Sequence, residues 1–489
     1  MTLPKAKEFL NKLSTEARTR TPSPMKSLGS YFNRENLVFL AGGMPMADLF
    51  PWNEISAKSP LPRHGSTFES MKQLQDSDVC ETMVRKTEGT VNGDIPLARS
   101  LQYGHTAGQP ELVAFLKEHT KMYHDMQYSD WQLITSAGNT QSWEATLRVF
   151  CDKGDTILVE AHSFTTSLSA AQAQGVNIEH IALDDDGIVP GALEATLHNW
   201  DPSVPLPKLL YLIPTGQNPT GSTLGEARRR EVYAIAQKYD LIIVEDEPYY
   251  FLQMDPFTRN RPERKDQSRM SHDEFRKSLI KSFISLDTDG RVVRLESFSK
   301  VLAPGTRLGW IVASQSLVER YIHFQEVAIQ APSGFTQTMV SGLLNRWGQE
   351  GYTNWLIALR TEYSNRRNAA CDALYKYLPL GSTVKMTPPT AGMFFIVKAD
   401  ASQHPEFLSK YGGSGMEVEK MFFQKFINNG VILVPGFWFK KASVELGSKP
   451  NEKQSSEIFF RGTFAAVDLK ALERGIKALA ECLKLEFCV

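Results

Sequence analysis

The sequence predicts an α/β protein whose parallel sheet is covered by helices on both faces and joined to a smaller α+β unit. Short β-branched or leucine-rich runs alternate with amphipathic stretches of helical length, which is the pattern of strands linked by helices. A chain of 489 residues is also too long for one simple core. The expected strands cover residues 131–136, 155–160, 208–214, 241–247, 291–297 and 308–314.

The same pattern predicts where the units lie. Alternating runs over residues 70–329 indicate the large unit, and the mixed helical and strand-like runs of residues 330–489 indicate the small one. A helix is expected over 223–240, with Thr223 as its cap. The charged segment 257–279 interrupts the pattern between two strands, so we expect a surface insertion, and only as the weaker alternative a binding element.

Composition excludes several classes of partner. A net charge of -1 argues against a surface dedicated to nucleic acid or to an anionic membrane. No stretch approaches the roughly 18 uninterrupted apolar residues of a membrane span. The five cysteines are scattered without metal-ligand spacing, so we expect reduced thiols, no metal site and, without a secretory signal, a cytoplasmic protein. Small molecules or a second copy of the chain are the expected partners.

Polar residues follow three of the expected strands at the sheet edge where α/β proteins bind ligands. Gly138, Asn139 and Thr140 open a helix, whose bare amides suit a phosphate, although asparagine and threonine are also ordinary helix caps. Asp246 lies at the end of an apolar strand and needs a cationic or hydrogen-bonding partner, which a simple salt bridge also satisfies. Asn218 lies in a Pro-Gly loop that can be merely a turn.

A lysine and an arginine follow a fourth strand. Ser297, Ser299, Lys300 and Arg307 are expected at the same edge. A partly desolvated lysine near another cation is a better nucleophilic amine, and an arginine fork with serine hydroxyls suits a phosphate dianion. Pyridoxal 5'-phosphate needs a phosphate cradle, an amine for its aldehyde and a carboxylate for its pyridine nitrogen. The sequence therefore predicts this cofactor.

An ordered set of motifs resembles one family along nearly the whole chain. The chain is similar to the fold-type I, class I aminotransferases, and among them to the kynurenine/2-aminoadipate aminotransferase II and fungal aromatic aminotransferase I groups. The resemblance implies a mostly parallel seven-stranded sheet, and an arm over residues 1–69 that belongs partly to the small unit and partly to the active-site entrance. The motifs are "RTPSPMKSL", "FLAGGMPMADLFPW", "LQYGHTAGQPELVAFL", "NPTG", "DEPYYFLQ", "ESFSKVLAPGTRLGW", "PTAGMFFIV" and "FFRGTFA".

The resemblance implies cofactor roles residue by residue. Lys300 matches the lysine that condenses with the aldehyde and moves the substrate proton, and Asp246 matches the partner of the pyridinium nitrogen. Tyr249 and Asn218 match donors to the phenolic oxygen, and Phe164 matches the residue stacked on the ring. Tyr103 matches a tyrosine that reaches the phosphate from the neighbouring subunit, which implies a homodimer with shared active sites. The matched phosphate-binding residues are Gly138, Asn139, Thr140, Ser297, Ser299 and Arg307.

Substrate-side roles follow in the same way. Arg461 matches the arginine that grips the α-carboxylate, for which the alternative is a surface ion pair. Gly43, Phe394 and Arg20 match a backbone contact, an aromatic wall and a mobile N-terminal cation, and Asn218 also lies on the substrate side.

Three departures from the family pattern stand out. Phe164 replaces a tyrosine, so stacking is kept and the hydroxyl is lost. The phosphate loop has Gly-Asn-Thr where Gly-Ser-Gln is usual, so its backbone contacts are more secure than its side-chain contacts. The insertion 257–279 is absent from the short kynurenine-type enzymes.

The expected function is reversible ping-pong transamination between an amino acid and a 2-oxo acid. Aromatic amino acids, 2-aminoadipate and kynurenine are the expected donors and 2-oxoglutarate the expected acceptor, with the segment from Arg20 to Met44 as an adaptable entrance. One alternative is a different cofactor chemistry, such as that of a β-lyase or synthase. A remote alternative is a cofactor-sensing transcription regulator, which would carry a DNA-binding winged helix before Leu40.

Overall fold

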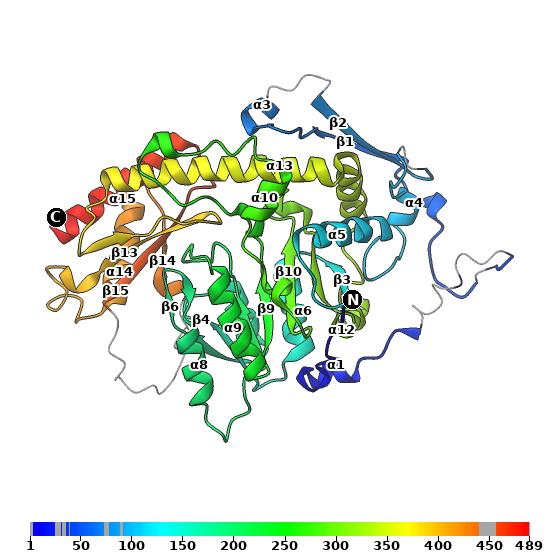
Figure 1. Cartoon of the computed structure of the whole chain (residues 1–489), viewed down its shortest axis with the longest axis horizontal. Helices are drawn as coiled ribbons and strands as arrows, with labels where there is room; N and C mark the ends of the chain where they lie inside the picture. Colours follow the sequence, from blue (N-terminus) through cyan, green and yellow to red (C-terminus); the bar gives the residue numbers. More distant parts are fainter. Residues whose placement is uncertain are drawn as a thin grey trace.

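The computed structural model describes residues 3–24, 31, 36–38, 40–72, 78–88, 91–439 and 456–488. At its centre is a seven-stranded sheet in the order β3-β11-β10-β9-β8-β4-β5, parallel except for β11 (Figure 1). This confirms the predicted α/β class and mostly parallel sheet. The strands are β3 (Trp131–Ser136), β4 (Thr156–Glu160), β5 (Asn177–Ile181), β8 (Leu209–Leu212), β9 (Ile242–Asp246), β10 (Val292–Ser297) and β11 (Gly309–Ser314).

The reversal at β11 follows from the length of the loop that precedes it. A parallel crossover needs roughly a dozen residues or more, usually including a helix. Residues 298–308 provide only a short loop with one 3-10 turn, η7 (Pro304–Thr306), so β11 returns antiparallel to β10. Lys300 and Arg307 therefore lie in a tight connection at the carboxyl edge of the sheet.

Two groups of helices accompany the sheet. The helix α6 packs against both α7 and α12, and in the second group α9 packs against both α8 and α11. All residues of β4, β8, β9, β10 and β11 are buried, as the apolar runs predict for strands covered on both faces. The helices in these groups are α6 (Asn139–Phe150), α7 (Thr165–Ala173), α8 (Pro190–His198), α9 (Glu226–Lys238), α11 (Phe283–Leu286) and α12 (Gln315–Ala328).

The predicted cap of α9 is wrong. The helix begins at Glu226 with Gly225 as its N-cap, three residues beyond the expected start. Thr223 Oγ1 instead accepts a hydrogen bond from the Gly216 amide at 3.0 Å. The hydroxyl therefore closes the loop that carries Asn218.

A second, antiparallel sheet forms the small unit, in the order β12-β13-β15-β14. The helix α13 connects the two units, and Figure 1 shows it running along both. Leu344 and Leu356 on this helix belong to the core of the large sheet, whereas Ala370 and Leu374 belong to the core of the small one. The elements are β12 (Val384–Met386), β13 (Phe394–Asp400), β14 (Val434–Pro435), β15 (Glu457–Thr463), α13 (Gly334–Tyr377), α14 (Gly415–Asn428) and α15 (Leu469–Phe487).

The remaining elements decorate these two units. The helix α1 packs on α6 and α12, and the β1-β2 hairpin packs on α13. In the part of the chain that the structure describes, no helix is both long and apolar enough to cross a membrane. The elements are α1 (Thr15–Thr19), β1 (Glu54–Pro60), α3 (Phe68–Lys72), β2 (Val79–Arg85), α4 (Leu97–Ser100), α5 (Pro110–Tyr123), β6 (Leu183–Asp184), β7 (Gly187–Ile188) and α10 (His272–Ser278), with 3-10 turns η1 (Leu10–Lys12), η3 (Ala47–Leu49), η5 (Tyr250–Leu252), η6 (Arg261–Glu263), η8 (Ala401–Gln403) and η9 (Gly436–Phe439).

The charged segment 257–279 lies on the outside of α13 and is packed there. Phe275 of α10 is fully buried. Arg264 donates to both carboxylate oxygens of Asp372 on α13, at 3.0 and 2.6 Å. The segment is thus a surface insertion, as expected, but one tied to the helix that connects the two units.

Candidate active site

The carboxylate of Asp246 is held from two sides at the carboxyl end of β9. Tyr211 Oη donates to Oδ2 and Asn139 Nδ2 donates to Oδ1, both at 2.6 Å. Burial raises the pKa of Asp246 to about 6, against the lowering effect of these two hydrogen bonds. The carboxylate is thereby oriented and ready for a cationic partner.

Tyr211 is a site residue that sequence reasoning missed. It lies inside the buried strand β8, where a tyrosine is most simply a core residue, and Trp143 packs on its ring at 4.4 Å between centroids. Its register partner on β9 is Val244, and side chains two residues apart share a face of a strand, so Tyr211 faces Asp246. Only the strand order and register, which the sequence does not state, could have revealed this contact.

The loop before α6 forms a glycine turn against Arg307. Gly138 has a φ of +96°, and a Cβ there would lie 2.9 Å from Arg307 Nη2. Arg307 donates from Nη2 to the Ala137 carbonyl at 2.7 Å, and Thr140 is exposed in the first turn of α6. A guanidinium and the free amides of a helix N-terminus therefore meet at one place, which suits an anion.

Asn139 has a different role from the one the resemblance suggested. Its side-chain amide is committed to Asp246 and to the Leu295 carbonyl, at 3.1 Å for the latter. In this arrangement its backbone, and not its side chain, is available to a phosphate. Its Oδ1 atom is buried and has no hydrogen-bond partner among the described residues.

Lys300 lies half-buried in the loop between β10 and β11. Burial lowers its pKa, and the nearby charge of Arg307 lowers the pKa further. Ser297 Oγ donates to Ser299 Oγ at 2.9 Å and accepts from the Ser299 amide at 3.1 Å. The loop thus presents an amine of lowered pKa beside two hydrogen-bonded hydroxyl groups.

Arg461 brings the small unit to this edge. Its Nη1 donates to Asn218 Oδ1 at 2.5 Å, and its guanidinium lies over the rings of Phe394 and Phe439, at 4.3 and 5.0 Å from the centroids. Burial lowers the pKa of Arg461. Phe394 also meets Tyr249 edge to face at 6.0 Å, so the cation is framed by aromatic rings.

Tyr249 and Phe164 lie at the same edge as the residues above. Tyr249 follows β9 and is buried, which together with Asp246 raises the pKa of its hydroxyl. Phe164 follows β4 and is the N-cap residue of α7, where its side chain is only partly buried.

The structure does not bring the other three predicted residues to this cluster within one chain. Arg20 pairs with Glu16 and lies 5.2 Å from the ring centroid of Phe324 on α12. Gly43 is exposed, and a Cβ there would meet nothing within 4 Å. Tyr103 is 62% exposed.

The residues present fit pyridoxal 5'-phosphate. Asp246 offers a carboxylate for a protonated ring nitrogen, and Asn139 beside it keeps a buried oxygen that has no partner among the described residues. Arg307, the α6 amides and the serine pair supply donors for a phosphate, and Lys300 supplies the amine. The fold and this site together define an enzyme that depends on pyridoxal phosphate.

Comparison with known proteins specifies the class. Residues 97–479 match the family described as "Aminotransferase class I and II". The chain is 37% identical to an aromatic amino acid aminotransferase of Schizosaccharomyces pombe, over 98% of each chain. Its structure is similar to that of the aminotransferase Aro8 from Candida albicans, with a TM-score of 0.93, 45% identity and coverage of 99% and 100% of the two chains. It is also similar to a kynurenine aminotransferase of Pyrococcus horikoshii, with a TM-score of 0.64, 26% identity and 97% coverage of each chain.

The chain therefore belongs to the class I and II aminotransferases. It is a pyridoxal-phosphate-dependent aminotransferase, and amino acids and 2-oxo acids are its substrates.

Proposed function

We propose that the chain transfers the amino group of aromatic amino acids to a 2-oxo acid such as 2-oxoglutarate by a ping-pong mechanism. The observation that carries this proposal is the position of Arg461 between Phe394 and Phe439, with Asn218 at its Nη1 atom. A guanidinium fork binds an α-carboxylate, and neighbouring rings favour an aromatic side chain. The aromatic amino acid aminotransferase of Schizosaccharomyces pombe supports the same substrate class.

Kynurenine and 2-aminoadipate belong to the same proposal as further donors. Kynurenine has an aromatic ring that suits the same walls. 2-Aminoadipate carries a second carboxylate and needs a second cation. The segment from Arg20 to Met44 is our candidate for an adaptable entrance, and its residues 25–30, 32–35 and 39 lie outside the described part of the chain.

Each residue of the site has a proposed task. When bound, the cofactor supplies an aldehyde that takes up the amino group and a ring that accepts the electron pair of the broken Cα–H bond. Lys300 would move the proton from the substrate Cα to the carbon that carried the cofactor's aldehyde, and Asp246 would hold the ring nitrogen protonated. Tyr249 and Asn218 donate hydrogen bonds to the phenolic oxygen, and Phe164 stacks on the ring. Arg307, Ser297, Ser299 and the first turn of α6, including Thr140, hold the phosphate.

A homodimer with shared active sites is part of the proposal. Tyr103 is 62% exposed in the single chain, although the resemblance assigns it to a phosphate. Leu40, Met46 and Leu49, on the segment beside Gly43, are also exposed, and exposed apolar clusters mark association surfaces. Contact with the partner would bury this segment and bring Tyr103 to the other subunit's site.

Two further expectations stay proposals. One is the division of the chain into an arm, a large unit and a small unit, with boundaries at 69/70 and 329/330. The structure adds that Phe9 and Leu13 of the arm pack in the core of the large sheet. A cytoplasmic location is the other, supported by five cysteines that are all free thiols.

A half-reaction screen tests the substrate proposal. The absorbance of the holoenzyme is followed without any 2-oxo acid while each amino acid is added in turn. We expect phenylalanine, tyrosine and tryptophan to convert the cofactor from its aldehyde form to its amine form fastest, and 2-oxoglutarate to restore the aldehyde form. Conversion of the cofactor by aliphatic amino acids alone would contradict the proposal. Release of pyruvate and ammonia without any 2-oxo acid acceptor would favour a β-lyase.

A further inference from the structure

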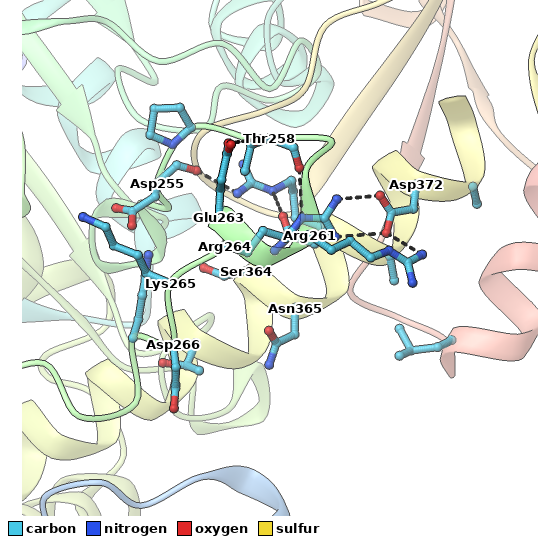
Figure 2. A pocket seen from close by; sticks show the side chains of 18 of the residues that line it. Asp255, Thr258, Arg261, Glu263, Arg264, Lys265, Asp266, Ser364, Asn365 and Asp372 are labelled. Atoms are coloured by element: carbon cyan, nitrogen blue, oxygen red, sulfur yellow. Dashed lines mark hydrogen bonds and ion pairs between the residues drawn. The ribbon is translucent and has the colours of Figure 1, made fainter. Parts of the chain in front are cut away.

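A large polar cavity lies away from the active site, between α13 and the loop 255–267. Its volume is about 1030 Å³, at the upper end of the roughly 300–1,000 Å³ typical of ligand pockets. Figure 2 shows Arg261 and Arg264 converging on Asp372 at one side of the cavity, with Asp255 and Lys265 at the other. The charged insertion thus lines this solvent-open space, together with the connecting helix α13 and the start of α15.

The charged side chains on the two sides of the cavity differ in whether they have close ion-pair partners. Asp372 is shared by two guanidinium groups and is neutralised within the protein. Lys265 has no carboxylate within ion-pair distance in the described part of the chain. Among the described residues, the Asp255 carboxylate has only Arg360 as an ion-pair partner, at a long 3.4 Å. A donor and an acceptor are therefore left available on the same side.

Two buried polar atoms in the lining also lack partners. Ser364 is 8% exposed and Gln267 is 6% exposed, yet neither Ser364 Oγ nor Gln267 Oε1 has a hydrogen-bond partner among the residues described. Buried polar groups are nearly always paired, so each exception needs an explanation.

The Ser364 hydroxyl is unusual for its own helix. Thr353 and Thr361 on α13 donate to the carbonyl four residues earlier, both at 2.8 Å. Ser364 makes no such bond. It lies one helical turn from Arg360 and from Arg367, which both contact Asp255, and so it is on the face turned toward the cavity.

These groups select a ligand with both charges. The lining carries as many acidic as basic side chains, so a purely anionic or cationic ligand would meet as much repulsion as attraction. An ammonium group suits Asp255 and Gln267 Oε1, and a carboxylate suits Lys265 and the Ser364 hydroxyl. We propose that this cavity binds a free α-amino acid as a zwitterion, at a site separate from the active site.

A short chain of contacts links this site to the substrate side. Arg367 donates to the Asp255 carbonyl at 2.7 Å and to the Pro389 carbonyl at 2.6 Å. Pro389 begins the segment that leads to Phe394, the ring beneath Arg461. Arg367, which lines the cavity, therefore connects the backbone at Asp255 to the segment that leads to the aromatic wall of the active site.

The test must separate this site from the active site, which also binds amino acids. The holoenzyme is first inactivated with aminooxyacetate, which condenses with the cofactor's aldehyde and occupies the substrate position. Glycine and L-glutamine are then titrated and followed by saturation-transfer NMR. Acetate and methylamine, which each carry only one of the two charges, are titrated in parallel.

The variants are Ser364→Ala and Lys265→Met, with Lys277→Met as the matched control. Lys277 is an exposed lysine of α10 in the same insertion and does not line the cavity. We expect saturable binding of both amino acids to the wild-type and control proteins, and binding weakened about 10-fold or more in each cavity variant. Acetate and methylamine should bind far more weakly than glycine.

Three results would overturn the proposal. One is the absence of saturable amino-acid binding to the inactivated wild-type enzyme, and another is an unchanged affinity in either cavity variant. The third is acetate binding as tightly as glycine, which would assign the cavity to anions.

Discussion

Tyr211 Oη donates a hydrogen bond to Asp246 Oδ2 at 2.6 Å, from a neighbouring strand of the same sheet. Asp246 is buried, and an unpaired buried carboxylate would lose its charge. The tyrosine therefore helps to keep the carboxylate ionised and oriented, although it makes no hydrogen bond or ring contact with Lys300 among the described residues.

Replacing Tyr211 by phenylalanine should weaken catalysis while the fold is retained. A hydrogen bond to a charged group is worth about 1.5–3 kcal/mol, so we expect kcat/KM to fall roughly 10- to 100-fold. The cofactor absorbance should also titrate at a shifted pH, which a loss of stability alone would not cause. Tyr321→Phe is the matched control, because Tyr321 is equally buried and its hydroxyl bonds the neutral Thr146 at 2.8 Å. Equal losses in the two variants would contradict this role.

Cofactor affinity should depend on pH through Asp246. Without the cofactor, burial raises the pKa of this carboxyl to about 6. A protonated ring nitrogen pairs only with the carboxylate, so protons compete with the cofactor below that pH. We expect the cofactor dissociation constant to rise about tenfold for each pH unit below 6 and to be independent of this group above it. Asp246→Asn should bind more weakly and lose this dependence, as titration of the apoenzyme will show.

Arg461→Ala should impair every α-carboxylate substrate without loss of the cofactor. The guanidinium lies on the small unit, and among the described residues none of those proposed to hold the phosphate contacts it. Loss of a bidentate charged pair costs about 3 kcal/mol, so kcat/KM should fall on the order of 100-fold with cofactor absorbance unchanged. Loss of the cofactor absorbance in this variant would mean that Arg461 holds the cofactor and not the substrate carboxylate, which would contradict the assignment.

Gly138→Ala should weaken the hold on the phosphate. An alanine is strained at a φ of +96°, and its Cβ would lie 2.9 Å from Arg307 Nη2. We expect the cofactor dissociation constant to rise at least tenfold, measured by equilibrium dialysis. Gly305→Ala is the control, because a Cβ there meets nothing within 4 Å in the same loop as Arg307. Similar affinities for the two variants would exclude the predicted clash.

The sequence predicted those site residues whose positions follow from strand ends alone. Asp246 and Lys300 each follow an apolar run, and in a parallel sheet the carboxyl ends meet at one edge. The fold class follows from the same alternation. The tight return into β11 also keeps Lys300 close to Arg307, as their spacing suggested.

The contacts that the sequence did not predict depend on strand register and on side-chain direction. Tyr211 required knowledge of which residues of β8 and β9 lie opposite each other, and the turn of Asn139 toward Asp246 required the position of α6. Arg20 was carried over by resemblance, yet its local partner Glu16 holds it beside α12. The cavity beside Asp372 could not be foreseen, because the insertion gave no periodic signal.

Reduction of the holoenzyme with borohydride followed by peptide mapping tests the central claim most directly. The reagent fixes the cofactor to the amine that holds it. The site described above predicts a single modified peptide, with the cofactor on Lys300. Label on any other lysine would contradict the assignment of this loop and the chemistry built on it.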